Sequence, residues 1–325
     1  MINGLINPKN SSDLIPAGES PLDRNPAAVF LGSLAQGSRR SQRQALNKMA
    51  GLLIGSPAAD CLALPWAALR YQHTAALRAQ LIGLYRPATV NKFLSALRGV
   101  LKEAWRLGLM TADDYQRAAD LESVKGENLP TGRQLTPGEI LALMADCESD
   151  PSPAGVRDAA IIGLMYAAGL RREEVINLDL ASYDLGSGRL VIFGKRAKER
   201  SAYLTNGAAE ALADWLAVRG PAAGPLFLAV NKGGKIDPQG GRLTAQAVYN
   251  MLARRAQAAG VAKFSPHDLR RSFVSDLLEA GADIATVAKM AGHANVQTTA
   301  RYDRRPEAAK QKAAGLLHVP YHKRV

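Results

Sequence analysis

The sequence contains few cysteines and no long apolar stretch, and these two absences exclude whole classes of protein. Its two cysteines, Cys61 and Cys147, lie far apart and form no ligand-like spacing. They therefore predict neither a disulfide framework nor a structural zinc site. The longest uninterrupted apolar run, residues 159–170, is too short to cross a membrane and is typical of a buried helix.

The N-terminus also lacks the pattern of an export signal. Residues 1–26 contain no basic segment followed by an apolar one, so we expect no secretory signal and a cytoplasmic protein. The same residues are rich in Asn, Ser, Pro and Gly, which predicts a mobile N-terminal arm.

Negative charge is scarce relative to positive charge. The 325 residues include 41 Lys and Arg but 29 Asp and Glu, which gives a net charge of +12. The excess is concentrated in residues 30–110, where eleven Lys and Arg stand against Asp60 and Glu103. Such an excess indicates a polyanionic partner, and nucleic acid is a commoner one than an anionic membrane.

The chain length predicts two globular domains, and the apolar pattern places them. Residues 27–124 show helical periodicity without strands, which predicts a small all-helical domain. Residues 125–134 carry Gly, Pro and charge and are the predicted linker. The amphipathic segments of the first domain are residues 38–55, 65–84, 89–109 and 111–124.

The second domain, residues 135–325, is predicted to be mainly helical with one small antiparallel sheet. Its two strands, 189–193 and 201–205, flank a charged loop. The fold class is therefore mainly α: a helical domain followed by a mixed α/β domain. Helices are expected at 137–148, 154–169, 207–219, 244–259, 267–280, 283–291, 295–302 and 306–317.

Two motifs near the C-terminus, HDLRRSF and GHANVQTTARY, gather residues suited to phosphate chemistry. His267 and Arg270 are three apart at a predicted helix start, so both leave one face close to backbone N–H groups that favour an anion. His293 follows a glycine, and Tyr302 ends the second motif. A phenol is a poor nucleophile at neutral pH unless cations and imidazoles favour its phenolate.

Two further motifs, AAGLRREEV and GKRAKERS, add cations. The first ends the apolar helix on Arg171 and places Glu174 three residues later. The second places Lys195 in the loop between the two predicted strands. Taken singly, each motif is explained better by an ordinary feature: a helix end with an ion pair one turn apart, or a solvent-exposed hairpin.

Together and in this order, the four motifs resemble the tyrosine recombinase, or phage integrase, family, which includes the Xer recombinases. The resemblance runs from about residue 135 to residue 302. It extends more loosely over the helical N-terminal half, which looks like the core-binding domain of the family. The sequence differs from the family pattern in its N-terminal arm and in a polar insert at residues 231–241.

The resemblance implies a catalytic role for each of these side chains. Tyr302 would attack a DNA phosphodiester and leave a 3′-phosphotyrosine and a free 5′-hydroxyl. Arg171 and Arg270 would hold the non-bridging oxygens, a task that suits the planar guanidinium group. His267 would assist proton transfer at the tyrosine, and His293 would donate a hydrogen bond to the phosphate.

Two supporting roles complete the implied site. Lys195 would protonate the leaving 5′ oxygen, and Glu174 would hold the site from behind. Arg172 and Lys198 are the neighbours most easily confused with Arg171 and Lys195. The resemblance implies no metal and no cofactor, and the sequence has no GxxxxGK[ST] motif for ATP.

The implied partner is double-stranded DNA, bound by a dimer on one site and by a tetramer when two sites are joined. Accessory proteins are further candidate partners, whereas no membrane partner is expected. Residues 307–317 would dock on a neighbouring subunit through Leu316 and Leu317, or pack on their own domain. The residues expected to contact phosphates are Arg39, Arg40, Arg43, Lys48, Lys92, Arg98 and Lys102.

Three other functions are compatible with parts of the sequence. A type IB topoisomerase-like enzyme would use the same chemistry on a single duplex. A DNA-binding protein without catalysis would keep the basic domain but lose catalytic residues, which are intact here. A basic RNA- or membrane-binding bundle would need an RNA module or an amphipathic anchor, and neither is present in the sequence.

Overall fold

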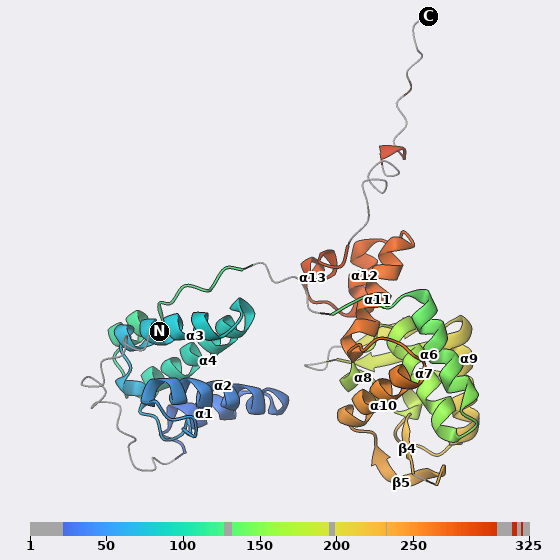
Figure 1. The fold of residues 1–325 in the computed structure, drawn as a ribbon, viewed down its shortest axis with the longest axis horizontal. Helices are drawn as coiled ribbons and strands as arrows, with labels where there is room; N and C mark the ends of the chain where they lie inside the picture. The colour runs from blue at the N-terminus through green and yellow to red at the C-terminus, as the bar shows by residue number, and fades with distance from the viewer. Residues whose placement is uncertain are drawn as a thin grey trace, which may run out of the picture. The chain divides into compact units, whose positions relative to one another are not determined.

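The computed structural model describes residues 22–126, 132–194, 199–231, 233–303, 314–316 and 320. The chain divides into two compact units, residues 1–130 and 131–325, each with an apolar core of its own (Figure 1). None of the helices in these described ranges combines the length and apolar character that crossing a membrane would need.

The first unit is built from helices alone in its described residues, and α4 lies at its centre. Residues Val90, Leu94, Leu97 and Leu101 of α4 are fully buried, at the spacing of one helix face. That face packs against α1, α2, α3 and α5. The elements are α1 (Pro26–Ser33), α2 (Gln36–Ile54), the 3₁₀ turn η2 (Trp66–Ala68), α3 (Tyr71–Leu84), α4 (Pro87–Arg106) and α5 (Ala112–Ala119).

Helix α1 is an element that the sequence patterns did not predict. Asn25 caps it: its side chain accepts hydrogen bonds from two backbone N–H groups and donates one to the Leu62 carbonyl. Phe30 of α1 packs against Gly99 of α4. The segment is apolar nearly all round, so it has no helical periodicity to detect. The last two residues of the predicted arm, Asn25 and Pro26, are therefore part of this unit, whereas residues 1–21 lie outside the described residues.

The second unit is mainly helical with small antiparallel sheets, which confirms the predicted fold class. Strands β1 (Tyr183–Asp184), β2 (Arg189–Phe193) and β3 (Glu199–Tyr203) form one sheet in that order. A second hairpin, β4 (Leu228–Val230) with β5 (Ile236–Arg242), was not predicted and includes most of the polar insert. The helices are α6 (Pro137–Ser149), α7 (Pro153–Ala167), α8 (Arg172–Asn177), α9 (Asn206–Arg219), α10 (Ala245–Ala258), α11 (Pro266–Glu279), α12 (Ile284–Ala291) and α13 (Val296–Ala300).

Helix α7 is the central element of the second unit, and its apolar sequence predicted a buried helix. It is buried along most of its length and packs against α6, α9 and α11 (Figure 1). Asp158 of α7 is fully buried and accepts from three arginine side chains, so its charge is compensated. Arg255 of α10 extends this ionic network to Asp146 of α6 and to Asp150, which follows that helix.

The predicted linker, residues 125–134, contains the boundary between the two units. Its residues 127–131 lie outside the described residues. Arg133 is fixed on the second unit, because its backbone N–H donates to Asp268 and its guanidinium pairs with Glu139 at 2.7 Å. Gln134 is fixed there as well, by a hydrogen bond to Asp276. The predicted last helix, 306–317, lies almost wholly outside the described residues.

Candidate active site

Arg270 ties its own motif to AAGLRREEV and to the residue just before GHANVQTTARY, in each case through a backbone carbonyl. It lies in the first turns of α11 and is only 2% exposed. Its Nη1 donates to the carbonyl of Gly169 at 2.6 Å, and its Nη2 donates to the carbonyl of Ala291. Gly169 follows α7 and precedes Arg171, whereas Ala291 ends α12 just before His293. The guanidinium is thus fixed from two sides.

The buried position of Arg270 leaves part of its guanidinium available. Among the described residues, its Nε is buried without a hydrogen-bond partner. Burial, followed by repulsion from Arg171, lowers the pKa of Arg270 to about 9. The group therefore remains a cation at neutral pH, and it has a donor left for an anionic ligand.

Glu174 holds Arg171 at the start of α8. One carboxylate oxygen accepts from the Arg171 backbone N–H, and the other accepts from Arg171 Nη1, both at 2.8 Å. The Arg171 side chain is 44% exposed, so it can reach a ligand at the surface. Burial opposes ionisation of Glu174, but hydrogen bonds from Arg200 and Arg171 outweigh it and lower the pKa of this carboxyl group.

Tyr302 and the two histidines lie at the same site. His293 follows Gly292, which ends α12 in the left-handed conformation, and its Nδ1 lies 2.8 Å from the hydroxyl of the buried Thr299. Tyr302 follows α13, and its ring stacks against that of His293 with 6.3 Å between centroids. The Tyr302 hydroxyl lies 3.3 Å from Nε2 of His267.

Both imidazoles are neutral at neutral pH. Burial, followed by repulsion from Arg270, lowers the pKa of His267, and the same causes lower the pKa of His293 to about 4. A neutral imidazole can accept a proton from a phenol, whereas an imidazolium cannot. The pair His267 and Tyr302 therefore has the geometry and the charge state of a base and its nucleophile.

Two arginines of the site were not singled out in the sequence. Arg200 of β3 donates to Glu174 at 2.9 Å and to the carbonyl of Met290 at 3.1 Å. Arg271 places its guanidinium carbon 5.1 Å from the centre of the Tyr302 ring, a cation–π distance. Both belong to quoted motifs, but only the tertiary structure shows that they face the site.

The structure thus brings six of the predicted site residues together on one part of the second unit. Lys195 and its neighbour Lys198 lie outside the described residues, so their place in the site stays a prediction. Within the described ranges, no group of three or more His, Cys, Asp or Glu could hold a metal ion. The six residues are Arg171, Glu174, His267, Arg270, His293 and Tyr302.

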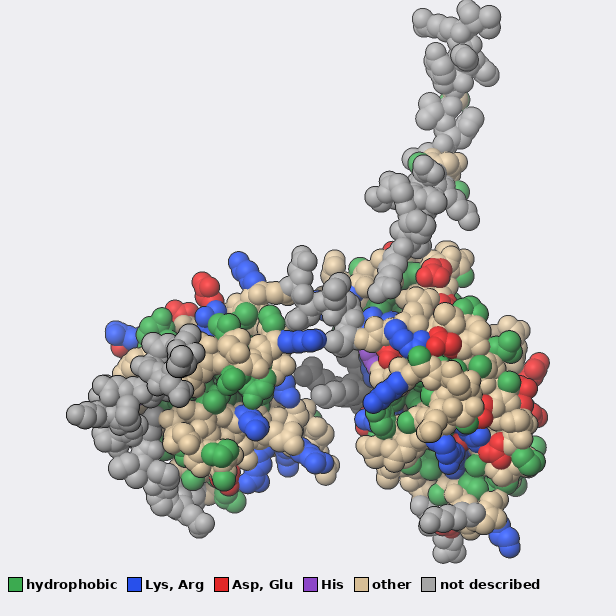
Figure 2. All heavy atoms as spheres, viewed as in Figure 1, with side chains coloured by type: hydrophobic (Ala, Val, Ile, Leu, Met, Phe, Trp, Pro, Cys, Tyr) green, Lys and Arg blue, Asp and Glu red, His purple; other side chains and the backbone are tan. Residues whose placement is uncertain are grey.

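The predicted phosphate-contacting residues lie on α2 and α4 of the first unit, and they differ in their contacts. Lys48 and Lys92 line a groove of about 510 Å³ between these helices, together with polar residues such as Asn47. Arg98, in contrast, donates to the carbonyls of Ala119 and Leu121 and so closes the end of α5. Figure 2 shows more basic than acidic side chains on the visible face of this unit.

Three other predicted arginines are exposed on α2. Arg39 donates to two carbonyls at the end of α1, and Arg43 pairs with Asp60 at 3.3 Å. Arg40, like Lys102 of α4, is exposed to solvent. These positions allow contact with DNA, although the bonds of Arg39 and Arg43 would compete with it.

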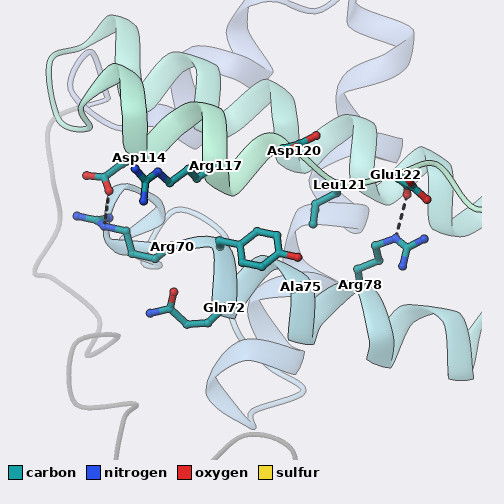
Figure 3. A pocket seen from close by; sticks show the side chains of 10 residues that line it. Arg70, Gln72, Ala75, Arg78, Asp114, Arg117, Asp120, Leu121 and Glu122 are labelled. Carbon is teal, nitrogen blue, oxygen red and sulfur yellow. Dashed lines mark hydrogen bonds and ion pairs between the residues drawn. The ribbon is translucent and has the colours of Figure 1, made fainter.

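A larger cleft of about 900 Å³ lies between α3 and α5 of the first unit (Figure 3). Arg70 pairs there with Asp114 at 3.2 Å, and Arg78 donates to the Glu122 carbonyl. Its lining has as many acids as arginines, whereas, among the described residues, no acid lines the groove at Lys48. It contains none of the predicted site residues.

Comparisons with known proteins identify the family of this chain. Residues 133–308 match the model of the phage integrase family. The tyrosine recombinase XerD of Pseudomonas aeruginosa is 33% identical over 74% of this chain and 77% of its own length. XerD of Caulobacter vibrioides is 37% identical over 66% of this chain and 70% of its own length.

Solved structures show the same fold. An integrase of the Tn1549 transposon, in complex with a circular intermediate DNA, has a TM-score of 0.66 and 15% identity over 92% of this chain and 100% of its own. The XerH recombinase bound to palindromic difH has a TM-score of 0.65 and 19% identity over 94% and 99%. The chain therefore belongs to the phage integrase family of tyrosine recombinases.

Proposed function

We propose that Tyr302 cleaves DNA by attacking a phosphodiester, with His267 as its base. Family membership makes this chain a site-specific recombinase, an enzyme that cleaves and rejoins DNA. The observation that supports this assignment of residues is the 3.3 Å separation between the Tyr302 hydroxyl and His267 Nε2. This pair of side chains lies beside Arg270, whose buried Nε would donate to the phosphate.

The proposed reaction assigns one step to each of these residues. The Tyr302 oxygen forms a bond to phosphorus while its proton passes to His267, and the bond from phosphorus to the 5′ oxygen breaks. Arg171 and Arg270 neutralise the charge that grows on the non-bridging oxygens. Lys195 donates a proton to the leaving 5′ oxygen. The phosphotyrosine keeps the energy of the phosphodiester, so rejoining needs no ATP.

Binding of double-stranded DNA requires the first unit as well. We propose that Lys48 and Lys92 contact phosphates across their groove, aided by the exposed Arg40 and Lys102. The Arg98 side chain donates to backbone carbonyls, so we do not include it in this surface. A dimer on each site, a tetramer during strand exchange, accessory proteins and a cytoplasmic location complete the proposal.

Two of the three alternative functions, a type IB topoisomerase-like enzyme and a non-catalytic DNA-binding protein, are less well supported. A type IB topoisomerase-like activity would swivel one duplex, whereas the similar proteins are recombinases. Transfer of a label between two duplexes distinguishes strand exchange from relaxation. A non-catalytic DNA-binding protein would not need the side chains of His267, Arg270 and Tyr302 to lie at one site.

Covalent attachment to DNA tests the proposal. Adducts formed on total DNA of the source organism would be recovered with the protein and sequenced to find the site. A duplex of that site, nicked so that the 5′-hydroxyl fragment diffuses away, should then trap wild type as a covalent complex. Tyr302→Phe should trap none yet bind with nearly unchanged affinity, because binding depends on phosphate contacts elsewhere.

The control is Tyr203→Phe, since Tyr203 is exposed on β3 and outside the proposed site. It should trap DNA like wild type. A Tyr302→Phe variant that still traps DNA would assign the nucleophile to another tyrosine.

A further inference from the structure

We infer that Arg200 is a positioning residue for DNA cleavage, which holds Glu174, and through it Arg171, in register with the chain segment that carries His293. The inference rests on the proposed function, because it assigns Arg171 to the phosphate. Arg200 itself takes no part in the chemical steps described above.

Arg200 joins two parts of the site from a third element. It lies on β3, and its side chain is only 13% exposed. Its Nη2 donates to Glu174 Oε2 at 2.9 Å, while its Nε donates to the carbonyl of Met290 at 3.1 Å. Glu174 belongs to α8, and Met290 lies near the end of α12. One guanidinium thus ties the two helix ends together.

The side chain of Arg200 also fits the turn before His293. A Cβ added to Gly292 would lie 3.0 Å from Arg200 Cδ, so the methylene groups pass close beside this glycine. Gly292 adopts φ 63°, a conformation that favours glycine. The turn that directs His293 into the site is therefore packed against Arg200.

The carboxylate of Glu174 shows why a cation is needed at this position. Oε1 accepts from the Arg171 side chain, whereas Oε2 accepts from both the Arg171 backbone and Arg200. The Glu174 side chain is only 6% exposed, so water cannot replace a missing partner easily. Without Arg200, Glu174 would lose a charged donor and could rotate, and Arg171 would move with it.

Arginine suits this task better than lysine does. A planar guanidinium can donate to a carboxylate and to a carbonyl in two fixed directions at once, whereas an ammonium group is a single point of charge. We therefore expect a lysine at residue 200 to restore little of the function.

Arg219 shows what a purely structural buried arginine looks like in this chain. It is 7% exposed, and its guanidinium donates to the carbonyls of Gly220, Ala222 and Pro225 in the loop after α9. None of these partners holds a proposed catalytic residue. Arg219→Met is therefore a matched control, since it removes a buried, hydrogen-bonded guanidinium elsewhere in the same unit.

The experiment compares two substrates in single-turnover cleavage of the nicked duplex. One carries the ordinary scissile phosphate, and the other carries a methylphosphonate, which lacks the negative charge that Arg171 neutralises. Arg200→Met should slow cleavage of the phosphate by roughly 10²-fold, the cost of misplacing a catalytic group by about 1 Å. Its defect should shrink at least tenfold on the methylphosphonate, and Arg200→Lys should behave like Arg200→Met.

Binding and folding are measured alongside. Arg200→Met should shift the duplex in a gel with nearly the affinity of wild type. Arg219→Met should lower the melting temperature but keep the cleavage rate of the folded protein. Rates are compared well below the melting temperature of each variant, so that loss of folded protein does not imitate a slow step.

A double-mutant cycle covers the case in which Arg200→Met folds poorly. If Arg200 acts through Glu174, then Arg200→Lys should slow cleavage much less in a Glu174→Gln background than in wild type. The inference would be overturned if Arg200→Lys slowed cleavage by the same factor in both backgrounds. It would also be overturned if Arg200→Met slowed cleavage of the two substrates equally. An Arg200→Met variant that cleaves like wild type would overturn it as well, whereas a wild type without any adduct would instead refute the proposed function.

Discussion

His267 Nε2 lies 3.3 Å from the hydroxyl of Tyr302, although the two residues are 35 positions apart in the chain. One stands in the first turn of α11, and the other follows α13. The separation is close to that of a hydrogen bond, so the proposed base already faces the proposed nucleophile without DNA. Because burial and Arg270 lower the pKa of His267, this imidazole is ready to accept a proton at neutral pH.

The pH dependence of cleavage should reflect this lowered pKa value. The reaction needs a neutral His267 to accept the proton, so the rate should stay level as the pH falls from 8 to about 6.5, the ordinary histidine range. The rate should decline only at lower pH, through the lowered pKa of His267. The measurement is the cleavage rate at subsaturating DNA, which reports the free enzyme. A decline that begins above pH 7 would contradict it.

Gly169 should be sensitive to a single added methyl group. It adopts φ 58°, and a Cβ there would overlap the ring of Phe273. Since its carbonyl accepts from Arg270 at 2.6 Å, a shift of this turn would move the guanidinium. Gly169→Ala should therefore slow single-turnover cleavage by roughly 10²-fold.

Gly260 provides the control for backbone strain at Gly169. It has φ 66° at the end of α10, but a Cβ there would meet open space. Gly260→Ala should lower the melting temperature slightly and leave cleavage unchanged. If both variants lost cleavage equally, strain alone would explain the effect, and the link to Arg270 would fail.

Lys195 should be distinguishable as the acid for the leaving oxygen. Lys195→Ala should slow cleavage of ordinary DNA by roughly 10²–10⁴-fold, the usual contribution of a positioned general acid. It should recover on a 5′-bridging phosphorothiolate, because a thiolate leaves without a proton. Arg171→Ala and Arg270→Ala should not recover, since they act on the non-bridging oxygens. Equal defects of Lys195→Ala on both substrates would assign it to binding, and Lys198 would be tested next.

The groove between α2 and α4 should contribute much of the salt-dependent affinity. Replacing Lys48 and Lys92 together by Ala should weaken binding at low salt and reduce the slope of log K against log salt by about 2, roughly one per phosphate contact. Titrations at several salt concentrations measure this slope.

Two arginines of the same unit serve as controls for the groove. Arg117→Ala removes an exposed cation that pairs with Asp113 on α5, so the slope should stay unchanged. Arg98→Met should lower the melting temperature, because Arg98 closes the end of α5, and should leave the slope unchanged as well. A slope that falls equally in all three proteins would indicate a diffuse charge effect without a defined groove.

The helical architecture followed from local patterns that sequence shows directly. The apolar run at 159–170 predicted the buried α7. A helix was also expected at 137–148, and Thr136 and Glu139 cap each other at the start of α6. The apolar pattern did not predict two elements. Helix α1 is apolar nearly all round, and the second hairpin lies in a polar insert. Both elements are decided by contacts with distant segments, such as Phe30 against Gly99.

The sequence by itself determined the family, because four motifs in one order carry that information without any geometry. It could not determine which cations face the site. Arg271 stands beside Arg270, and a one-residue difference changes the side of a helix on which a side chain lies. Arg200 was placed in the charged loop before the predicted strand 201–205, whereas it lies on β3 (Glu199–Tyr203). Only the packing of α8, β3, α11 and α12 buries Arg200 against Glu174 and sets Arg270 between two carbonyls. Burial and charge compensation are properties of these contacts between distant segments, so the tertiary structure alone decided them.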